Sequence, residues 1–236
     1  MSTIGIYSST EAIRSDWHLA AKLIDHTLLK PEATREQITQ ICREAAEYGF
    51  HAVMVNPCYI AHCVAELRGS GVVVGTVIGF PLGATTSTSK LAEAVDTLRL
   101  GAGELDMVIN VGALKSGERD LVQMEMQSMA QLCHRSGALL KVILETALLT
   151  TEEKILVCQL AVAAEVDFVK TSTGFSTAGA TAADVALMRG VVGRGVGVKA
   201  AGGIRSAADL LNAVEAGANR VGASASVEIV RELGAG

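Results

Sequence analysis

The sequence predicts an α/β protein, a single closed (β/α)8 barrel (TIM barrel) across residues 1–236, with a helical extension at residues 1–21. Eight short apolar runs alternate with amphipathic helical patterns, and no Pro- or Ser-rich linker separates them. Each unit is about 27 residues long, a normal length for a strand, a helix and their loops. Strict alternation implies a parallel sheet, and eight units favour a closed barrel over an open doubly wound sheet.

The elements follow in order along the chain. A helical pattern at 11–21 forms the extension ahead of the first strand. The strands are expected at the apolar runs 23–27, 51–55, 72–78, 105–109, 139–144, 168–170, 197–200 and 220–222. Helices are expected from capping-box, apolar-spacing and terminal-glycine signals at 34–49, 91–101, 120–137, 150–165, from 181 onward, at 206–217, and after 226. The turn after the first strand, at 25–31, lacks the glycines that an open dinucleotide-binding sheet needs there.

Composition narrows the class of partner and the compartment. Hydrophobic residues make up 50% of the chain and aromatic residues only 3%, which suits buried parallel strands. The net charge of −5 argues against nucleic acid as a partner but leaves a small anionic ligand possible. Residues 1–20 show no signal-peptide pattern and no apolar run could span a membrane, so we expect a soluble cytoplasmic protein.

The cysteines and one glycine pattern could suggest other functions. The five cysteines are odd in number and lie mostly in apolar helical patterns, which indicates buried free thiols: Cys42, Cys58, Cys63, Cys133 and Cys158. A metal site at Cys58, His62 and Cys63 lacks a second ligand pair at suitable spacing. Gly195 and Gly197 match a loose dinucleotide pattern but precede a strand instead of following one.

Three lysines lie near the ends of predicted strands. Lys141, Lys170 and Lys199 are spaced by 29 residues and again by 29, so we expect comparable positions on three adjacent strands. A single strand-end lysine most often extends its charged end to solvent. Three in one confined interior repel one another unless carboxylates intervene, and this favours a chemical role.

Carboxylates are available on neighbouring strands. Asp106 lies on the fourth strand, Asp25 on the first, and Glu145 follows the fifth. Polar residues near the C-terminal ends of barrel strands are typical of active sites. The structural alternatives are that Asp25 only caps a turn and that Glu145 only pairs with Lys141.

Clustered lysines can make one of them a nucleophile. An isolated lysine has a pKa of about 10.4 and is protonated at neutral pH. A second ammonium about 5 Å away costs about 3 kcal/mol, which lowers the pKa by about two units, and burial adds to this. The lysine can then form a Schiff base, with an aspartate alongside to move protons.

Two glycine-bearing segments predict a phosphate site. Residues 202–206 follow the seventh strand and residues 222–226 follow the eighth, each entering a helix. Loops at these positions usually form the phosphate site of such a barrel. Glycine lets the backbone N–H groups approach the ligand closely.

The motifs together resemble the deoxyribose-phosphate aldolase family, class I aldolases on a (β/α)8 barrel. They are LIDHTLLKP at 23–31, GELDMVINVGALKSG at 103–117, LLKVILET at 139–146, DFVKTSTGFS at 167–176 and GVKAAGGIRS at 197–206. The resemblance covers nearly all of the chain after residue 22. It implies reversible cleavage of 2-deoxy-D-ribose 5-phosphate to D-glyceraldehyde 3-phosphate and acetaldehyde, as part of deoxyribose phosphate catabolism.

The resemblance also implies roles for individual residues. Lys170 would form the Schiff base, and Asp106 and Lys199 would be the proton donor/acceptor pair. Supporting residues are expected at Asp25, Lys141 and Thr173, and phosphate-binding residues at Gly174, Gly202, Gly203, Gly222 and Ser224. No metal or organic cofactor is implied, because the imine withdraws the electrons of the bond that breaks. The resemblance also implies a homo-oligomer, expected to be a dimer.

One residue departs from the family pattern. Family members commonly have two adjacent serines in the last loop, whereas here the second position is Ala225. A backbone N–H or Ser226 would then have to replace the missing hydroxyl. Two alternatives stay open: a transaldolase-like Schiff-base enzyme, and a non-catalytic sugar-phosphate-binding protein.

Overall fold

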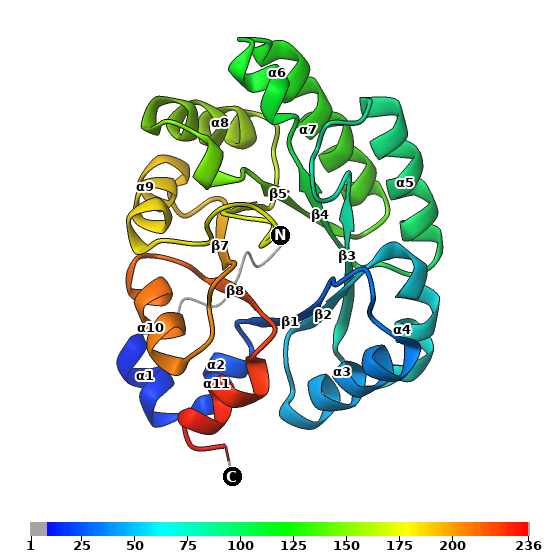
Figure 1. Ribbon diagram of the computed structural model, residues 1–236, viewed down its shortest axis with the longest axis vertical. Coiled ribbons are helices and arrows are strands. Elements are labelled where there is room, and N and C mark those ends of the chain that lie inside the picture. The colour runs from blue at the N-terminus through cyan, green and yellow to red at the C-terminus, as the bar shows by residue number, and fades with distance from the viewer. Residues whose placement is uncertain (1–8, 236) are drawn as a thin grey trace.

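Eight parallel strands close into a barrel in sequence order, and the last pairs with the first (Figure 1). This computed structural model describes residues 9–235. The strands are β1 (Ile24–Leu28), β2 (Ala52–Val55), β3 (Val73–Ile78), β4 (Glu104–Val108), β5 (Leu139–Ile143), β6 (Phe168–Lys170), β7 (Gly197–Ala201) and β8 (Arg220–Ala223). The predicted (β/α)8 barrel is confirmed.

Helices surround the barrel and connect its strands (Figure 1). They are α3 (Arg35–Tyr48), α4 (Ile60–Glu66), α5 (Ser87–Arg99), α6 (Val111–Lys115), α7 (Arg119–Arg135), α8 (Thr151–Ala163), α9 (Ala182–Val192), α10 (Ala207–Glu215) and α11 (Ser226–Glu232). Two short 3₁₀ turns, Pro57–Tyr59 and Thr146–Leu148, precede α4 and α8. Helices α4 and α6 are not predicted from the sequence, because each is too short to show a helical repeat.

Two predicted capping boxes and one predicted terminal glycine mark helix ends in the structure. Thr34 and Gln37 form a reciprocal capping box at the start of α3, and Thr150 and Glu153 do the same for α8. Gly49 ends α3 with a φ of +66°, a conformation that glycine adopts without strain. These caps place the strand that follows each helix.

The helical extension differs from the prediction. Instead of one helix at 11–21, two short helices form, α1 (Thr10–Ser15) and α2 (Trp17–Ala21). Asp16 separates them because its backbone is extended and its side chain accepts a hydrogen bond from the His18 N–H, which caps α2. The part of the extension at residues 1–8 lies outside the described residues. In Figure 1, α1 lies beside α10 and α2 beside α11.

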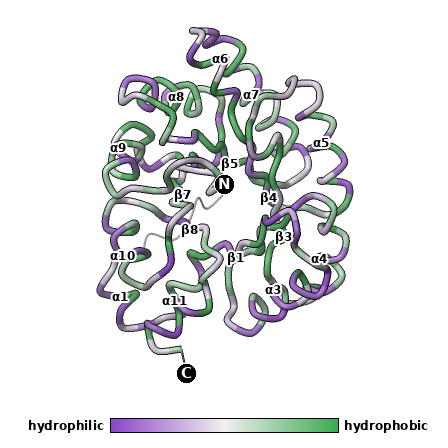
Figure 2. Tube along the Cα trace, in the orientation of Figure 1, coloured by the Kyte–Doolittle hydropathy of each residue, from purple (hydrophilic) through white to green (hydrophobic). Residues whose placement is uncertain are grey.

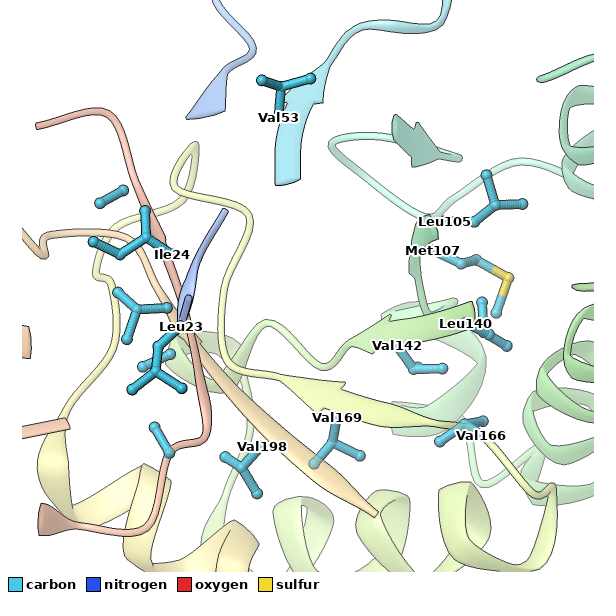
Figure 3. Close-up of a cluster of buried hydrophobic side chains, with 14 of the residues drawn as sticks. Leu23, Ile24, Val53, Leu105, Met107, Leu140, Val142, Val166, Val169 and Val198 are labelled. Atoms are coloured by element: carbon cyan, nitrogen blue, oxygen red, sulfur yellow. The ribbon is translucent and has the colours of Figure 1, made fainter. Parts of the chain in front are cut away.

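The hydrophobic core lies between the barrel and its helices. Outward-facing residues such as Val142, Val169 and Val198 are fully buried there (Figure 3). Hydrophilic residues gather instead on outer turns of helices such as α3 and α4 (Figure 2). Because side chains alternate along a strand, the neighbours of these valines point into the barrel, and several of those are charged.

Candidate active site

A cavity of about 370 Å³ opens at the C-terminal ends of the strands. Lys170 lies on its wall, and the C-terminal ends of β1, β7 and β8 and the loops after β1, β6, β7 and β8 contribute the rest. The five predicted phosphate-binding residues and Thr173 all line it: Gly174, Gly202, Gly203, Gly222 and Ser224. The structure therefore brings the predicted nucleophile and the predicted phosphate loops to one cavity.

Lys170 ends β6 and is buried, with its Nζ donating a hydrogen bond to Asp106 Oδ2 at 2.7 Å. Burial lowers the pKa of this lysine to about 8, and the nearby Lys199 and Lys141 ammonium groups act in the same direction. The Asp106 carboxylate opposes the shift without cancelling it. A useful fraction of Lys170 is thus an uncharged amine near neutral pH.

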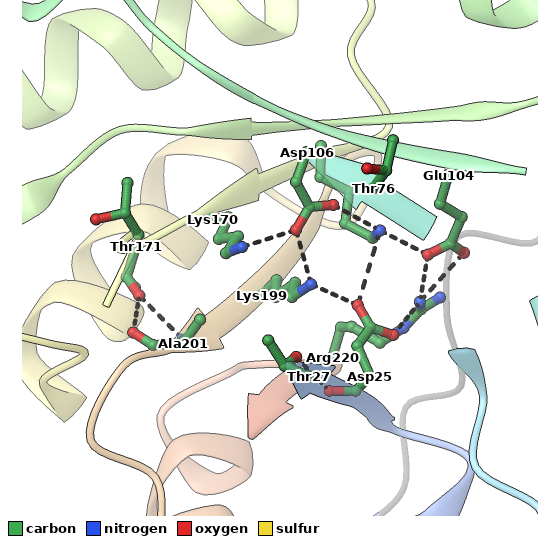
Figure 4. Close-up of polar contacts among 12 residues, drawn as sticks. Asp25, Thr27, Thr76, Glu104, Asp106, Lys170, Thr171, Lys199, Ala201 and Arg220 are labelled. Atoms are coloured by element: carbon green, nitrogen blue, oxygen red, sulfur yellow. Dashed lines mark hydrogen bonds and ion pairs between the residues drawn. The ribbon is translucent and has the colours of Figure 1, made fainter. Parts of the chain in front are cut away.

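Lys199 and Lys170 share one carboxylate oxygen (Figure 4). Lys199 Nζ lies 2.8 Å from Asp106 Oδ2 and 2.5 Å from Asp25 Oδ2. The two lysine nitrogens are therefore no farther apart than the sum of their distances to the shared oxygen. That separation is well inside the about 8 Å screening length of physiological salt, so each charge affects the other.

Lys141 lies deeper in the barrel than its spacing predicted. In the strand register Lys170 is opposite Lys199, whereas Lys141 is opposite Phe168 and Asp106. Equal sequence spacing failed because the register joins residues 27 apart between β5 and β6, Lys141 and Phe168, but residues 29 apart between β6 and β7, Lys170 and Lys199. Lys141 donates to Asp106 Oδ1 at 2.8 Å and lies 2.5 Å from Glu104 Oε2.

The deeper position makes Lys141 a permanent cation. Burial alone would lower its pKa, but the carboxylates of Asp106, Glu104 and Asp25 outweigh burial and raise the pKa above its usual value. Lys141 is thus suited to hold Asp106 in place and unsuited to attack a carbonyl.

Two members of this network, Glu104 and Arg220, were not predicted. Arg220 donates to Asp25 Oδ1 at 2.9 Å and to Glu104 Oε2 at 3.0 Å, and its guanidinium lies over the Phe168 ring. Burial would raise the pKa of Glu104, but Lys141 and Arg220 lower it to about 2. Alternation along β4 could have revealed Glu104, since it lies two residues before Asp106 on the same face.

The charges inside the barrel are nearly matched. Three carboxylates meet four basic side chains: Asp25, Glu104 and Asp106 against Lys141, Lys170, Lys199 and Arg220. The interior is electrically neutral when one of the four bases is uncharged. Lys170 is the base whose pKa is lowered, whereas the pKa values of Lys141 and Arg220 are raised. Charge balance therefore favours a neutral Lys170.

Asp106 itself is held as a carboxylate. Burial would raise its pKa, but the three lysines around it lower the pKa well below the usual range. The pKa of Asp25 is likewise lowered, because Lys199, Arg220 and Lys141 outweigh burial. Asp25 therefore does more than cap a turn: it holds Lys199 and Arg220.

Glu145 has a different partner from the one suggested by sequence. It accepts hydrogen bonds from the backbone N–H of Thr173 at 3.3 Å and from Thr173 Oγ1 at 2.5 Å. The suggestion that Glu145 pairs with Lys141 is wrong. The contact instead fixes the turn that begins at the end of β6, and Thr173 Oγ1 also accepts from the Phe175 N–H at 3.0 Å.

Two cations that were not singled out from sequence line the cavity: Lys30 in the loop after β1 and Arg205 in the loop after β7. Gly222 also leaves room for the Lys199 side chain, since a methyl group added there would lie 3.1 Å from Lys199 Cε.

Ser226 does not replace the missing serine at 225. Its hydroxyl is buried, lies 3.0 Å from His26 Nδ1 and donates to the Ala223 carbonyl oxygen at 3.0 Å.

Comparison with known proteins agrees with this geometry. Residues 19–234 match the profile of the DeoC/LacD family aldolases. The chain belongs to this aldolase family. The match spans β1 to β8 and so includes every charged residue of the barrel interior. The chain is an aldolase, an enzyme of the carbon–carbon lyase class.

Relatives of this aldolase cover almost all of it. A protein named deoxyribose-phosphate aldolase from Lysinibacillus sphaericus (strain C3-41) is 56% identical over 213 residues, 90% of this chain and 95% of the relative. One of the same name from Thermoanaerobacter sp. (strain X514) is 53% identical over 213 residues, 90% of this chain and 96% of the relative. The structure of deoxyribose phosphate aldolase from Aeropyrum pernix superposes with a TM-score of 0.89 at 35% identity, over 100% of this chain and 99% of that one.

Two further features of the aldolase concern residues 9–235. No group of three or more His, Cys, Asp or Glu side chains in this range is arranged to hold a metal ion. His62 instead lies 2.7 Å from Thr39 Oγ1, between α4 and α3. No helix in the same range combines the length and the apolar character needed to cross a membrane.

Proposed function

We propose that this aldolase cleaves 2-deoxy-D-ribose 5-phosphate reversibly to D-glyceraldehyde 3-phosphate and acetaldehyde through a Schiff base on Lys170. One observation carries the proposal: a buried lysine with a pKa of about 8 lies on the wall of a cavity and contacts an ionised aspartate. The names of the relatives support the choice of substrate.

The first step is attack of neutral Lys170 on the aldehyde carbon of the open-chain sugar. Nζ forms the new C–N bond, the carbonyl oxygen takes up a proton, and loss of water gives the iminium. Asp106 Oδ2, which lies 2.7 Å from Nζ, can accept the amine proton that is released. Lys199, 2.8 Å from the same oxygen, can carry a proton to the departing oxygen.

Cleavage of the C2–C3 bond needs a base for the C3 hydroxyl proton. The bonding electrons pass to the iminium, which becomes a neutral enamine, and the C3 oxygen becomes the carbonyl of the released glyceraldehyde phosphate. One of the cations that lower the pKa of Asp106 disappears in this step, so the proton affinity of the carboxylate rises as the proton arrives. Asp106, with Lys199, is therefore suited to act as proton acceptor.

The same proton completes the cycle. Protonation of the enamine at C2 restores an iminium, and water then hydrolyses it to acetaldehyde and free Lys170. Arg220 and Lys141 keep Asp25, Glu104 and Asp106 paired throughout, so the interior need not reorganise at each step.

The phosphate would bind where the loops after β7 and β8 meet the cavity. Backbone N–H groups at Gly202, Gly203 and Gly222 can approach an anion closely, and Lys30 and Arg205 add positive charge. A phosphate held there leaves the aldehyde end free to reach Lys170. The reaction consumes a deoxysugar phosphate, which assigns the enzyme to deoxyribose phosphate catabolism.

The enzyme is further proposed to act as a homo-oligomer, for which a dimer was the expectation from the sequence. The Aeropyrum pernix relative is described as tetrameric, which supports self-association without fixing its order. Light scattering of the purified chain over a range of concentrations measures the mass, and a monomer at every concentration contradicts the proposal.

Trapping tests the chemistry directly. Acetaldehyde and borohydride should convert the imine to a stable two-carbon ethyl adduct, which peptide mass spectrometry locates on Lys170. Lys170→Met should abolish both the adduct and turnover, whereas Lys115→Met, at an exposed lysine on α6, should leave both unchanged. A label on another lysine, or no label, refutes the assignment.

A further inference from the structure

His26, on the outer face of β1, lies in a chain of hydrogen bonds that ends at the cavity wall. Its Nε2 is 2.7 Å from Glu44 Oε2 on α3, and its Nδ1 is 3.0 Å from Ser226 Oγ at the start of α11. Ser226 Oγ donates to the carbonyl oxygen of Ala223, which lines the cavity. The chain thus connects α3, β1 and the turn after β8.

The His26–Ser226 contact is shielded from water, whereas Glu44, at the other end of the chain, is 25% exposed. His26 is 3% exposed and Ser226 is fully buried, and the imidazole packs against the Phe50 ring with 5.1 Å between centroids. Buried polar atoms that lose a partner are not resolvated, so the chain constrains its members strongly. Gln40 Nε2 donates to the other oxygen of Glu44 at 2.9 Å and fixes that carboxylate.

The chain leaves the barrel sheet at Ser224, because Gly222 and Ala223 are buried and still pair with neighbouring strands. A polar hollow of about 350 Å³ lies on the outer side of the turn that follows, and Ser224 lines both this hollow and the active-site cavity. Ala225, which precedes α11, makes no side-chain cap. Ser224 therefore lies between two open spaces, and the hydrogen bond from Ser226 Oγ to the Ala223 carbonyl oxygen closes the turn that contains it.

We propose that His26 is a positioning residue for substrate phosphate: through Ser226 it holds the turn at residues 224–225, directly after β8, so that its backbone N–H groups face the anion. The inference rests on the proposed function, since it assumes that the phosphate binds at this turn. It assigns His26 no contact with the reacting carbon. Neighbouring Asp25 and Thr27 on β1 face the site, so one strand serves the chemistry from its inner face and the phosphate turn from its outer face.

The test compares a phosphorylated with an unphosphorylated substrate. Ser226→Ala removes only the hydroxyl, and we expect KM for 2-deoxyribose 5-phosphate to rise about five- to tenfold, the effect of one lost hydrogen bond. The value of kcat should stay within about twofold, and kcat/KM for 2-deoxyribose should be unchanged. His26→Leu should give the same split. His62→Leu is the matched control, because His62 also bonds to a neighbouring element, at Thr39 on α3, but has no partner in the turn after β8.

Glu44 offers a second measurement that does not alter the turn itself. Glu44→Gln keeps an acceptor oxygen for His26. Its KM should therefore rise much less than the KM of Glu44→Leu. An equal loss of kcat/KM with the phosphorylated and the unphosphorylated substrate would overturn the inference. So would an unchanged KM in Ser226→Ala and Glu44→Leu. Borohydride trapping on the same proteins separates the two proposals: an ethyl adduct on Lys170 without the KM split refutes only the positioning role, and no adduct in the unaltered enzyme refutes the proposed chemistry.

Discussion

The proposed reactivity of Lys170 depends on its burial at the end of β6. Only the neutral amine attacks a carbonyl, and the pKa of Lys170 is lowered to about 8. We expect kcat/KM to rise with pH on the acid side and to level off above about pH 8, because the amine loses its proton in that range. A pH–rate profile measures this, and a rate that is flat from about pH 6 upward contradicts it.

Lys199 should set the position of that profile. Its ammonium lowers the pKa of Lys170, so Lys199→Leu should move the acid limb to higher pH by about one unit and also slow turnover. Lys115→Leu removes an exposed lysine that pairs with Glu153 and should move nothing. A slower enzyme with an unmoved limb would mean that Lys199 transfers protons but does not tune the nucleophile.

Residue chemistry was predictable where side chains are chemically unusual for their position. Lys170, Asp106 and Lys199 could be grouped from sequence because a charged residue in an apolar strand needs a reason, and the structure brings the three side chains together. Glu104 and Arg220 were missed because each begins its strand, where a charged residue normally faces solvent. Only closure of the barrel brings Arg220 on β8 to Glu104 on β4, and no local pattern reports that contact.

At the scale of elements, the loop after β7 depends on the space around its glycines. Gly202 and Gly174 both have a φ of +85°, but a methyl group at Gly202 would lie 3.0 Å from Gly179 Cα, whereas one at Gly174 meets nothing within 4 Å. Gly202→Ala should therefore raise KM for the phosphorylated substrate about tenfold more than Gly174→Ala does, because only the former displaces the neighbouring loop. Steady-state kinetics of both variants measure the difference, and equal effects would show that backbone strain alone is responsible.

Elements were predictable in proportion to their length. Long helices such as α3 and α8 begin at capping boxes, so their starts follow from sequence. The five residues of α6 cannot show a helical period, and Asp16 looked like one polar position in a longer helix. The register between β5 and β6 places Lys141 deeper in the barrel than Lys170. Strand register is a property of the closed sheet, and spacing along the sequence does not report it.

At the scale of the whole molecule, the interior network should make stability depend on acid. Glu104 has its pKa lowered from 4.5 to about 2, and the pKa values of Asp25 and Asp106 are also lowered. The unfolded chain therefore binds protons more readily than the folded chain. The stabilisation from these carboxylates is then fully present above about pH 4.5. The free energy of unfolding falls as pH drops toward about 2.

The size of this effect can be assigned to one carboxylate. The shift at Glu104 corresponds to about 3 kcal/mol, which should be lost progressively across that acid range. Glu104→Gln should be less stable at neutral pH, because Lys141 and Arg220 lose a charged partner, and its stability should fall less steeply with acid. Urea unfolding at several pH values measures both, with Glu32→Gln at an exposed position as control. If Glu104→Gln loses stability with acid as steeply as the unaltered protein, protonation of Glu104 is not a cause of the loss.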